Sequence, residues 1–155
     1  MAKADSLGMT IKVLDNTCAV DTELAHVDLG IIAIREIRYN GGYSRPVPFS
    51  IKLKNCGVFA SKVKIYATGI TVPGDPDTLQ LQNYGATGTA SGIGVVVRNE
   101  QSSIVSINKN DNPGIYLLNA GADTNINFIA QYKRLGNDSS AGVADAMVNF
   151  SFEYL

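Results

Sequence analysis

Apolar and polar residues alternate along much of this 155-residue chain, a pattern that predicts β-strands with one buried face. The longest such stretch covers residues 142–155. One parity holds small, aliphatic and aromatic residues, namely Gly142, Ala144, Ala146, Val148, Phe150, Phe152 and Tyr154. The other parity is mostly polar, although Val143, Met147 and Leu155 interrupt it. We therefore expect a terminal strand with one apolar face that runs to Leu155 without a tail.

Shorter segments of the same kind come earlier in the chain. They are residues 9–14, 27–39, 47–55, 61–69, 93–99, 102–108, 115–119 and 124–134. The inward-facing residues expected in the clearest three are Phe49, Ile51, Leu53, Val63, Ile65, Ala67, Ile126, Phe128, Ala130 and Tyr132. Residues 71–92 are rich in Pro, Gly and Asp and are expected to form loops. No segment shows a sustained helical period, so we predict an all-β protein, an antiparallel β-sandwich.

Composition narrows the class of protein. The length fits one domain that buries its own core, and the net charge of −1 gives no reason to expect nucleic acid as a partner. No run of eighteen apolar residues occurs, so membrane insertion is not expected. The first residues, MAKADSLGMTIK, lack the apolar core of a signal peptide, which fits either a cytosolic protein or a mature form written with a starting Met.

The two cysteines bear on that choice. Cys18 and Cys56 each lie beside a strand-like segment, and two cysteines are too few for the usual zinc sites. Two free buried thiols in a cytosolic protein remain one interpretation. We favour a disulfide between them, and with it an oxidising compartment.

Residues that could carry chemistry are few. His26 is the only histidine, no Gly-x-Ser-x-Gly motif occurs, and a hydrolase on this fold would rest on His26 with scattered Ser and Asp. Asp75 and Asp77 in the segment PGDPD have carboxylates suited to calcium, but a turn explains them better. We therefore predict no catalytic residues, no metal and no cofactor.

These features together resemble the subunits of chaperone–usher pili. The similarity lies in the early Cys18 followed by VDLG, in VPFSIKLKNC with the second cysteine, and in the late strand INFIAQYKR. The terminal strand matches the family pattern of a Gly fourteen residues from the end and a penultimate Tyr, here Gly142 and Tyr154. Within the family, PVPFSIKLKNCG, SGIGVVVRNEQ and FSFEYL look most like the minor tip adaptor of type 1 fimbriae.

The resemblance implies an immunoglobulin-like sandwich that lacks its last strand. The apolar face of residues 142–155 then lines an acceptor groove, which a periplasmic chaperone fills first. At the outer-membrane usher, the N-terminal extension of the next subunit replaces the chaperone's strand. The carboxylate of Leu155 is expected to bind basic residues of the chaperone. The protein is thus expected to be a structural adaptor in an extracellular fimbrium of a Gram-negative bacterium, which it reaches through the periplasm.

The donor strand is expected before Cys18. Its inserted residues share one parity and are Leu7, Met9, Ile11 and Val13. Gly8, the candidate for the small residue that the family inserts, lies on the opposite parity. We divide the chain into an arm, residues 1–8, and a pilin domain, residues 9–155. An arm this short resembles a truncated or engineered segment, and the alternative that residues 7–13 are the domain's own first strand stays open.

The alternative to a structural adaptor is a sugar-binding protein. The same sandwich can carry a sugar-binding site, as in an adhesin, and Tyr39, Tyr43 and Tyr84 lie in loop-like settings that suit one. The chain has no Trp, and it is too short for an additional lectin domain.

Overall fold

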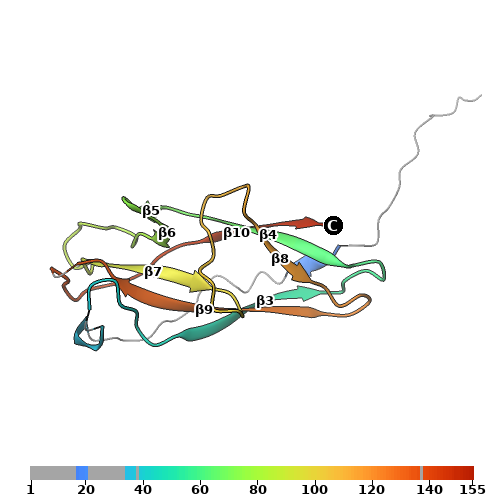
Figure 1. Ribbon diagram of the computed structural model, residues 1–155, viewed down its shortest axis with the longest axis horizontal. Coiled ribbons are helices and arrows are strands. Elements are labelled where there is room, and N and C mark those ends of the chain that lie inside the picture. The colour runs from blue at the N-terminus through green and yellow to red at the C-terminus, as the bar shows by residue number, and fades with distance from the viewer. Residues whose placement is uncertain (1–16, 21–33, 38, 137) are drawn as a thin grey trace, which may run out of the picture.

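The computed structural model describes residues 17–20, 34–37, 39–136 and 138–155. The fold is an all-β sandwich of two antiparallel sheets, which form the two layers seen in Figure 1. The predicted fold class is confirmed. The first predicted strand, residues 9–14, and the arm, residues 1–8, lie outside the described residues, as do Leu7, Met9, Ile11, Val13 and His26.

The larger sheet has six strands in the order β2-β3-β9-β7-β6-β5. Their bounds are β2 Ala19–Val20, β3 Val47–Lys54, β5 Thr71–Val72, β6 Asp75–Leu79, β7 Ile93–Arg98 and β9 Thr124–Arg134. The central pair, β3 and β9, is joined in register from Val47↔Ala130 to Leu53↔Thr124. Strand β9 alternates buried and more exposed residues along its length, as its period of two predicts.

The smaller sheet has three strands in the order β10-β4-β8. Their bounds are β4 Lys62–Thr68, β8 Gly114–Leu117 and β10 Asn149–Tyr154. Strand β4 is central and buries Val63, Ile65 and Ala67 against the other sheet, as expected from the sequence.

The core lies between the sheets and is centred on Phe128. Its ring stacks on Phe49 from β3 at 5.5 Å and on Phe150 from β10 at 5.6 Å, and it meets the edge of Tyr116 at 5.7 Å. Such ring pairs contribute about 0.5–1.5 kcal/mol each beyond the area that they bury. Phe128 thus ties the terminal strand to the opposite sheet.

Three segments differ from the sequence predictions. Residues Ile34–Glu36, expected in a strand, form a short 3-10 helix, and the Arg134 guanidinium donates to the carbonyl of Ile37 just after it. The expected loop after β4 contains the hairpin β5–β6, turned at Gly74 with a φ of 81°. Pro and Gly fit the tight turn of this hairpin, so their abundance did not exclude strands on either side.

The third difference concerns residues 102–108, expected as a strand. They make bridges to both sheets and no continuous ladder: Val105 N–H donates to Val97, and Asn108 N–H donates to Ala67. The segment crosses from the larger sheet to the smaller one. A crossing chain cannot keep one partner, which is why its alternation does not produce a strand.

Candidate functional site: the terminal strand and its outer edge

Strand β10 is an edge strand of the smaller sheet in the described part of the chain. Its one strand partner there is β4, in register from Asn149↔Thr68 to Tyr154↔Val63. Leu155 N–H donates to the carbonyl of Lys62 at 3.0 Å. This bond shows which residues of β10 turn their backbone groups towards β4. Because backbone groups in an antiparallel pair alternate in direction, those of Phe150, Phe152 and Tyr154 point away from β4. This edge therefore offers donors and acceptors to a further strand.

The side chains of the terminal segment follow the predicted parity. The half-buried ones pack against the core and are Ala144, Ala146, Val148, Phe150, Phe152 and Tyr154. The exposed ones are Val143, Asp145, Met147, Asn149, Ser151, Glu153 and Leu155. An apolar face that remains half exposed, beside an open backbone edge, is a surface that another apolar strand can cover.

The ladder of β10 is shorter than the alternating sequence. It begins at Asn149, whereas residues 142–148 run past other partners. Gln82 N–H donates to Asp145, and Ala90 N–H donates to Val143, so this stretch borders the 82–91 connection and not β4. The terminal segment stays extended throughout, but residues 142–148 border the 82–91 connection and residues 149–154 pair with β4. This explains why its period of two is unbroken although its ladder with β4 is short.

Two tyrosine hydroxyls fix the ends of this run. Tyr132 from β9 donates to the carbonyl of Ala144 at 3.1 Å, and Tyr154 donates to the carbonyl of Cys18 at 3.1 Å. Burial raises the pKa of the Tyr154 phenol, so it stays protonated as a donor over the physiological range. Sequence reasoning selected Tyr154 from the family pattern. It gave no sign of its partner, because Cys18 is far away in the chain.

Gly142 lies where two backbones meet. A Cβ atom at this position would be 2.5 Å from the backbone nitrogen of Ala90 and 2.7 Å from the carbonyl oxygen of Gly88. Neither atom belongs to a flexible side chain, so the backbone itself would have to shift. The structure gives Gly142 a packing role beside its place in the predicted site.

Replacing Gly142 with alanine should therefore destabilise the fold by about 1–3 kcal/mol, the usual cost of overpacking a well-packed site. Urea unfolding measures this. Gly136→Ala is the matched control, because nothing lies within 4 Å of its added Cβ, and it should change the free energy of unfolding by under about 0.5 kcal/mol. Equal effects at both positions would contradict the packing role.

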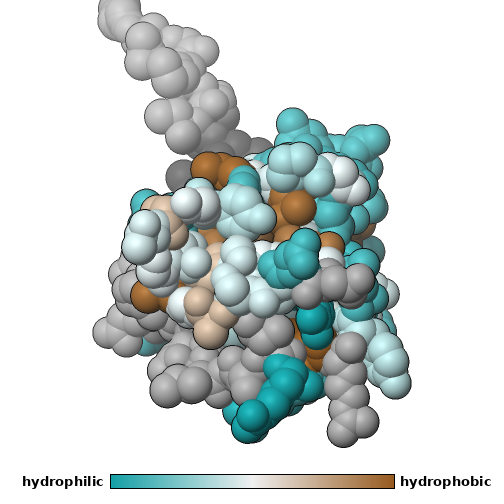
Figure 2. Space-filling model, turned by 90° about the vertical axis from the view of Figure 1, so that its left-hand side faces the viewer, coloured by the Kyte–Doolittle hydropathy of each residue, from teal (hydrophilic) through white to brown (hydrophobic). Residues whose placement is uncertain are grey.

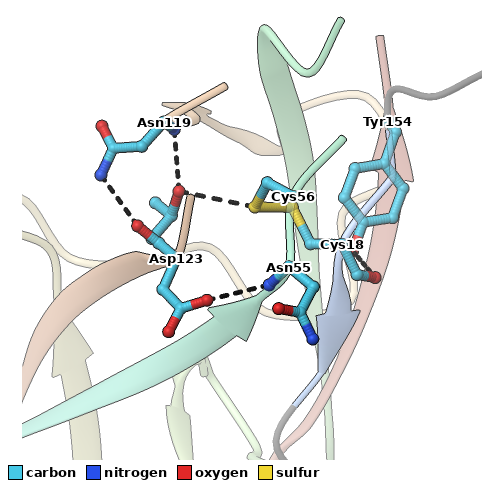
Figure 3. Close-up of a disulfide and its surroundings, with 7 residues drawn as sticks. Cys18, Asn55, Cys56, Asn119, Asp123 and Tyr154 are labelled. Atoms are coloured by element: carbon cyan, nitrogen blue, oxygen red, sulfur yellow. Dashed lines mark hydrogen bonds between the residues drawn. A yellow bond between two sulfur atoms is a disulfide. The ribbon is translucent and has the colours of Figure 1, made fainter. Parts of the chain in front are cut away.

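The predicted disulfide is confirmed: Cys18 and Cys56 are bonded, with their Cα atoms 4.1 Å apart (Figure 3). The bond joins β2 to the end of β3. Beside it, Asn55 N–H donates to the Asp123 carboxylate at 2.9 Å, and Asn119 donates to the buried Thr124 hydroxyl at 2.8 Å. The disulfide, this polar cluster and Tyr154 hold the end of the sandwich at which β10 ends.

The two acidic residues considered for calcium binding, Asp75 and Asp77, interact with lysine side chains. Asp75 accepts from the Lys133 ammonium at 2.6 Å, and Asp77 lies 3.8 Å from the Lys109 ammonium. Burial alone would raise the pKa of Asp75, but the hydrogen bond from Lys133, the nearby Thr78 hydroxyl and the Lys133 charge together outweigh it, so the pKa is lowered. The two acids bind cationic side chains, as expected of structural residues. In the described part of the chain, no three potential metal ligands gather, and no helix has the length and apolarity to cross a membrane.

The tyrosines considered for sugar binding differ in setting. Tyr39 and Tyr84 are exposed, but the ring of Tyr43 is covered by the Arg98 guanidinium, 4.6 Å from its centroid. Tyr43 also bridges to Lys133 of β9. One face of the Tyr43 ring is therefore already covered by a cationic side chain.

Comparison with known proteins agrees with this architecture. The profile of the Fimbrial protein family matches residues 6–155. A type-1 fimbrial protein subunit of Serratia marcescens is 29 % identical and covers 99 % of this chain and 88 % of its own. The C chain of the Escherichia coli type-1 fimbrial protein is 30 % identical, over 92 % of this chain and 79 % of its own.

Solved structures show the same fold. The P pilus rod subunit PapA superposes with a TM-score of 0.71 at 24 % identity, over 89 % of this chain and 99 % of that one. The CupB6 tip adhesin of Pseudomonas aeruginosa gives a TM-score of 0.69 at 25 % identity, over 88 % of this chain and 38 % of that one. The chain belongs to the Fimbrial protein family, whose relatives here are structural fimbrial subunits and not enzymes.

Proposed function

We propose that this subunit accepts a β-strand from another protein along the outer edge of β10 and is linked into a fibre in that way. The observation that carries the proposal is the coincidence of two features on one strand. The backbone groups of Phe150, Phe152 and Tyr154 point away from β4, and the side chains of the same residues form a half-buried apolar face. An added strand satisfies the backbone and covers the apolar face together.

The energy of such a contact suits a lasting link. Four apolar side chains that enter the groove contribute about 1.5–3 kcal/mol each, on the order of 6–12 kcal/mol in total. This is an upper estimate, because a donor segment already buries part of its surface when free. The sum is comparable to the stability of a whole domain. A subunit with an empty groove should be weakly stable, and a filled one should persist.

The donor in the fibre is proposed to be residues 7–13 of a neighbouring subunit. Leu7, Met9, Ile11 and Val13 share one parity, so a single extended strand presents all four to one groove. Before assembly, a periplasmic chaperone fills the same edge and the outer-membrane usher exchanges the two strands. The likeness of three sequence segments to the minor tip adaptor supports a place between an adhesin and the rod of an extracellular fimbrium.

A peptide titration tests the proposal. A synthetic peptide of residues 3–16 is added to the full chain, and the melting temperature is followed. We expect it to rise by roughly 10–20 °C or more, because each kcal/mol shifts the transition by about 2–4 °C in a domain of this size. The same peptide with Ile11→Asp should leave the transition unchanged. A high melting temperature that neither peptide alters would overturn the proposal.

The sugar-binding alternative receives less support. The match to the CupB6 tip adhesin extends over only 38 % of the length of that adhesin. In addition, the Arg98 guanidinium covers one face of the Tyr43 ring. A screen against a panel of glycans with several clear hits would favour that function instead.

A further inference from the structure

The two ends of β10 lie beside different exposed apolar residues. Where β10 ends, residues 57–60 form a reverse turn closed by Ala60 N–H donating to Gly57, and Phe59 at its tip is 76 % exposed. Where β10 begins, Ile70 is 75 % exposed and Met147 is 59 % exposed. Gly69, the residue before Ile70, lies against the backbone of Met147, because a Cβ added at Gly69 would be 3.0 Å from the carbonyl oxygen of Met147.

We propose that, in the fibre, the 57–60 turn of one subunit docks head to tail on Ile70 and Met147 of the subunit that receives its strand. The occupant of each surface is thus a second copy of this chain. This inference rests on the proposed donation of residues 7–13, and it adds a second contact between the two bodies.

The length of the connection between Thr17 and the donated strand limits where the donor's turn can lie. Thr17 is tied to the turn, since its carbonyl accepts from Gly57 N–H at 3.0 Å. Four residue steps separate Thr17 from Val13, the last inserted residue, and they span at most about 14 Å when fully extended. The 57–60 turn of the donor must therefore lie close to the point at which the donated strand leaves the acceptor.

The direction of the donated strand decides at which end of β10 the donor's turn lies. Every strand pair in both sheets of the described chain is antiparallel. A strand added to the free edge of β10 in the same manner runs from Tyr154 towards Asn149. It leaves the acceptor where β10 begins, beside Met147 and Ile70. Insertion in the parallel direction would bring the donor's turn to the other end, against the acceptor's own turn.

The surfaces at the two ends of β10 suit a weak contact that depends on the tether. Seen from the end at which β10 begins, the molecule is mixed, with separate apolar groups among hydrophilic ones (Figure 2). A contact between one turn and two apolar side chains buries far less area than a standard interface of about 1,600 Å². It would not hold free subunits together. A short tether supplies an effective concentration in the millimolar range, at which a weak contact is populated. Such a heterologous contact repeats along a fibre and limits bending between subunits.

Chemical cross-linking tests the contact. The full chain carrying Phe59→Cys and Met147→Cys is assembled into strand-linked multimers, treated with a short bismaleimide, and digested for mass spectrometry. The two positions lie at opposite ends of β10, whose six residues span about 20 Å, so a short reagent joins them between copies. We expect a 59–147 yield at least about tenfold higher than that between positions 59 and 151 in a control with Phe59→Cys and Ser151→Cys.

The outcomes separate this inference from the function on which it rests. A dominant 59–147 product supports head-to-tail docking. Multimers that give mainly 59–59 or 59–151 products, or no product, overturn the docking and leave strand donation standing. Complete failure to form multimers, with the parent chain also monomeric and unaffected by the peptide, overturns both.

Discussion

Replacing Phe152 with glutamate should weaken capture of a donor strand at least about a hundredfold. Phe152 lies in the middle of β10, its side chain packs against the core while remaining half exposed, and its backbone points to the open edge. A donated strand would bury the new carboxylate without a cationic partner, at a cost of several kcal/mol. A loss of 2.7 kcal/mol already corresponds to a hundredfold change in the dissociation constant.

The measurement is the affinity of the 3–16 peptide for each variant by calorimetry. Asn149→Glu is the matched control, because Asn149 lies on the same strand with its side chain exposed on the opposite face. It should bind within about threefold of the parent, since exposed substitutions seldom change stability by more than about 0.5 kcal/mol. Phe152→Leu should retain most of the affinity and shows that the charge, not the lost ring, is responsible. Equal binding by all three variants would exclude the β10 face as the acceptor.

Loss of the disulfide should lower the free energy of unfolding by about 4 kcal/mol. The bond closes a loop with a sequence separation of 38, and the loop-entropy model gives this value for such a length. In a domain of this size the melting temperature should fall by roughly 8–16 °C. The end of β10 should loosen as well, because the Tyr154 hydroxyl bonds to the carbonyl of Cys18 itself.

Urea unfolding of the double variant Cys18→Ala, Cys56→Ala against the parent measures the effect. Tyr154→Phe is a useful companion, since it removes one hydrogen bond, keeps the ring and should cost only about 0.5–1.5 kcal/mol. A cost below about 1 kcal/mol for the double cysteine variant would show that the native contacts around Cys56 and Thr124 hold this end of the sandwich without the covalent bond.

The sequence by itself determined which residues face the core. Phe128 and Ile51 are buried where the alternation places them, and the terminal segment keeps its parity from Ala144 to Tyr154. This works because a strand's period of two is a local property that the polarity of successive residues reports directly. The fold class was also predicted correctly, from the alternation and the turn residues between the strands. The disulfide was predicted correctly from the place of the two cysteines beside strand-like segments.

Only the tertiary structure decided which segments are partners. The alternation of residues 102–108 and 142–148 was real, yet neither segment forms a continuous ladder: residues 102–108 cross between the two sheets, and residues 142–148 border the 82–91 connection. The bond from Tyr154 to Cys18, the close approach at Gly142 and the free edge of β10 depend on contacts between residues far apart in the chain. A local pattern records how polar each position is, whereas strand partners are chosen by the global packing of the two sheets. The family resemblance led us to expect an acceptor groove along residues 142–155, but only the tertiary structure located the edge of β10 that has no strand partner in the described part of the chain.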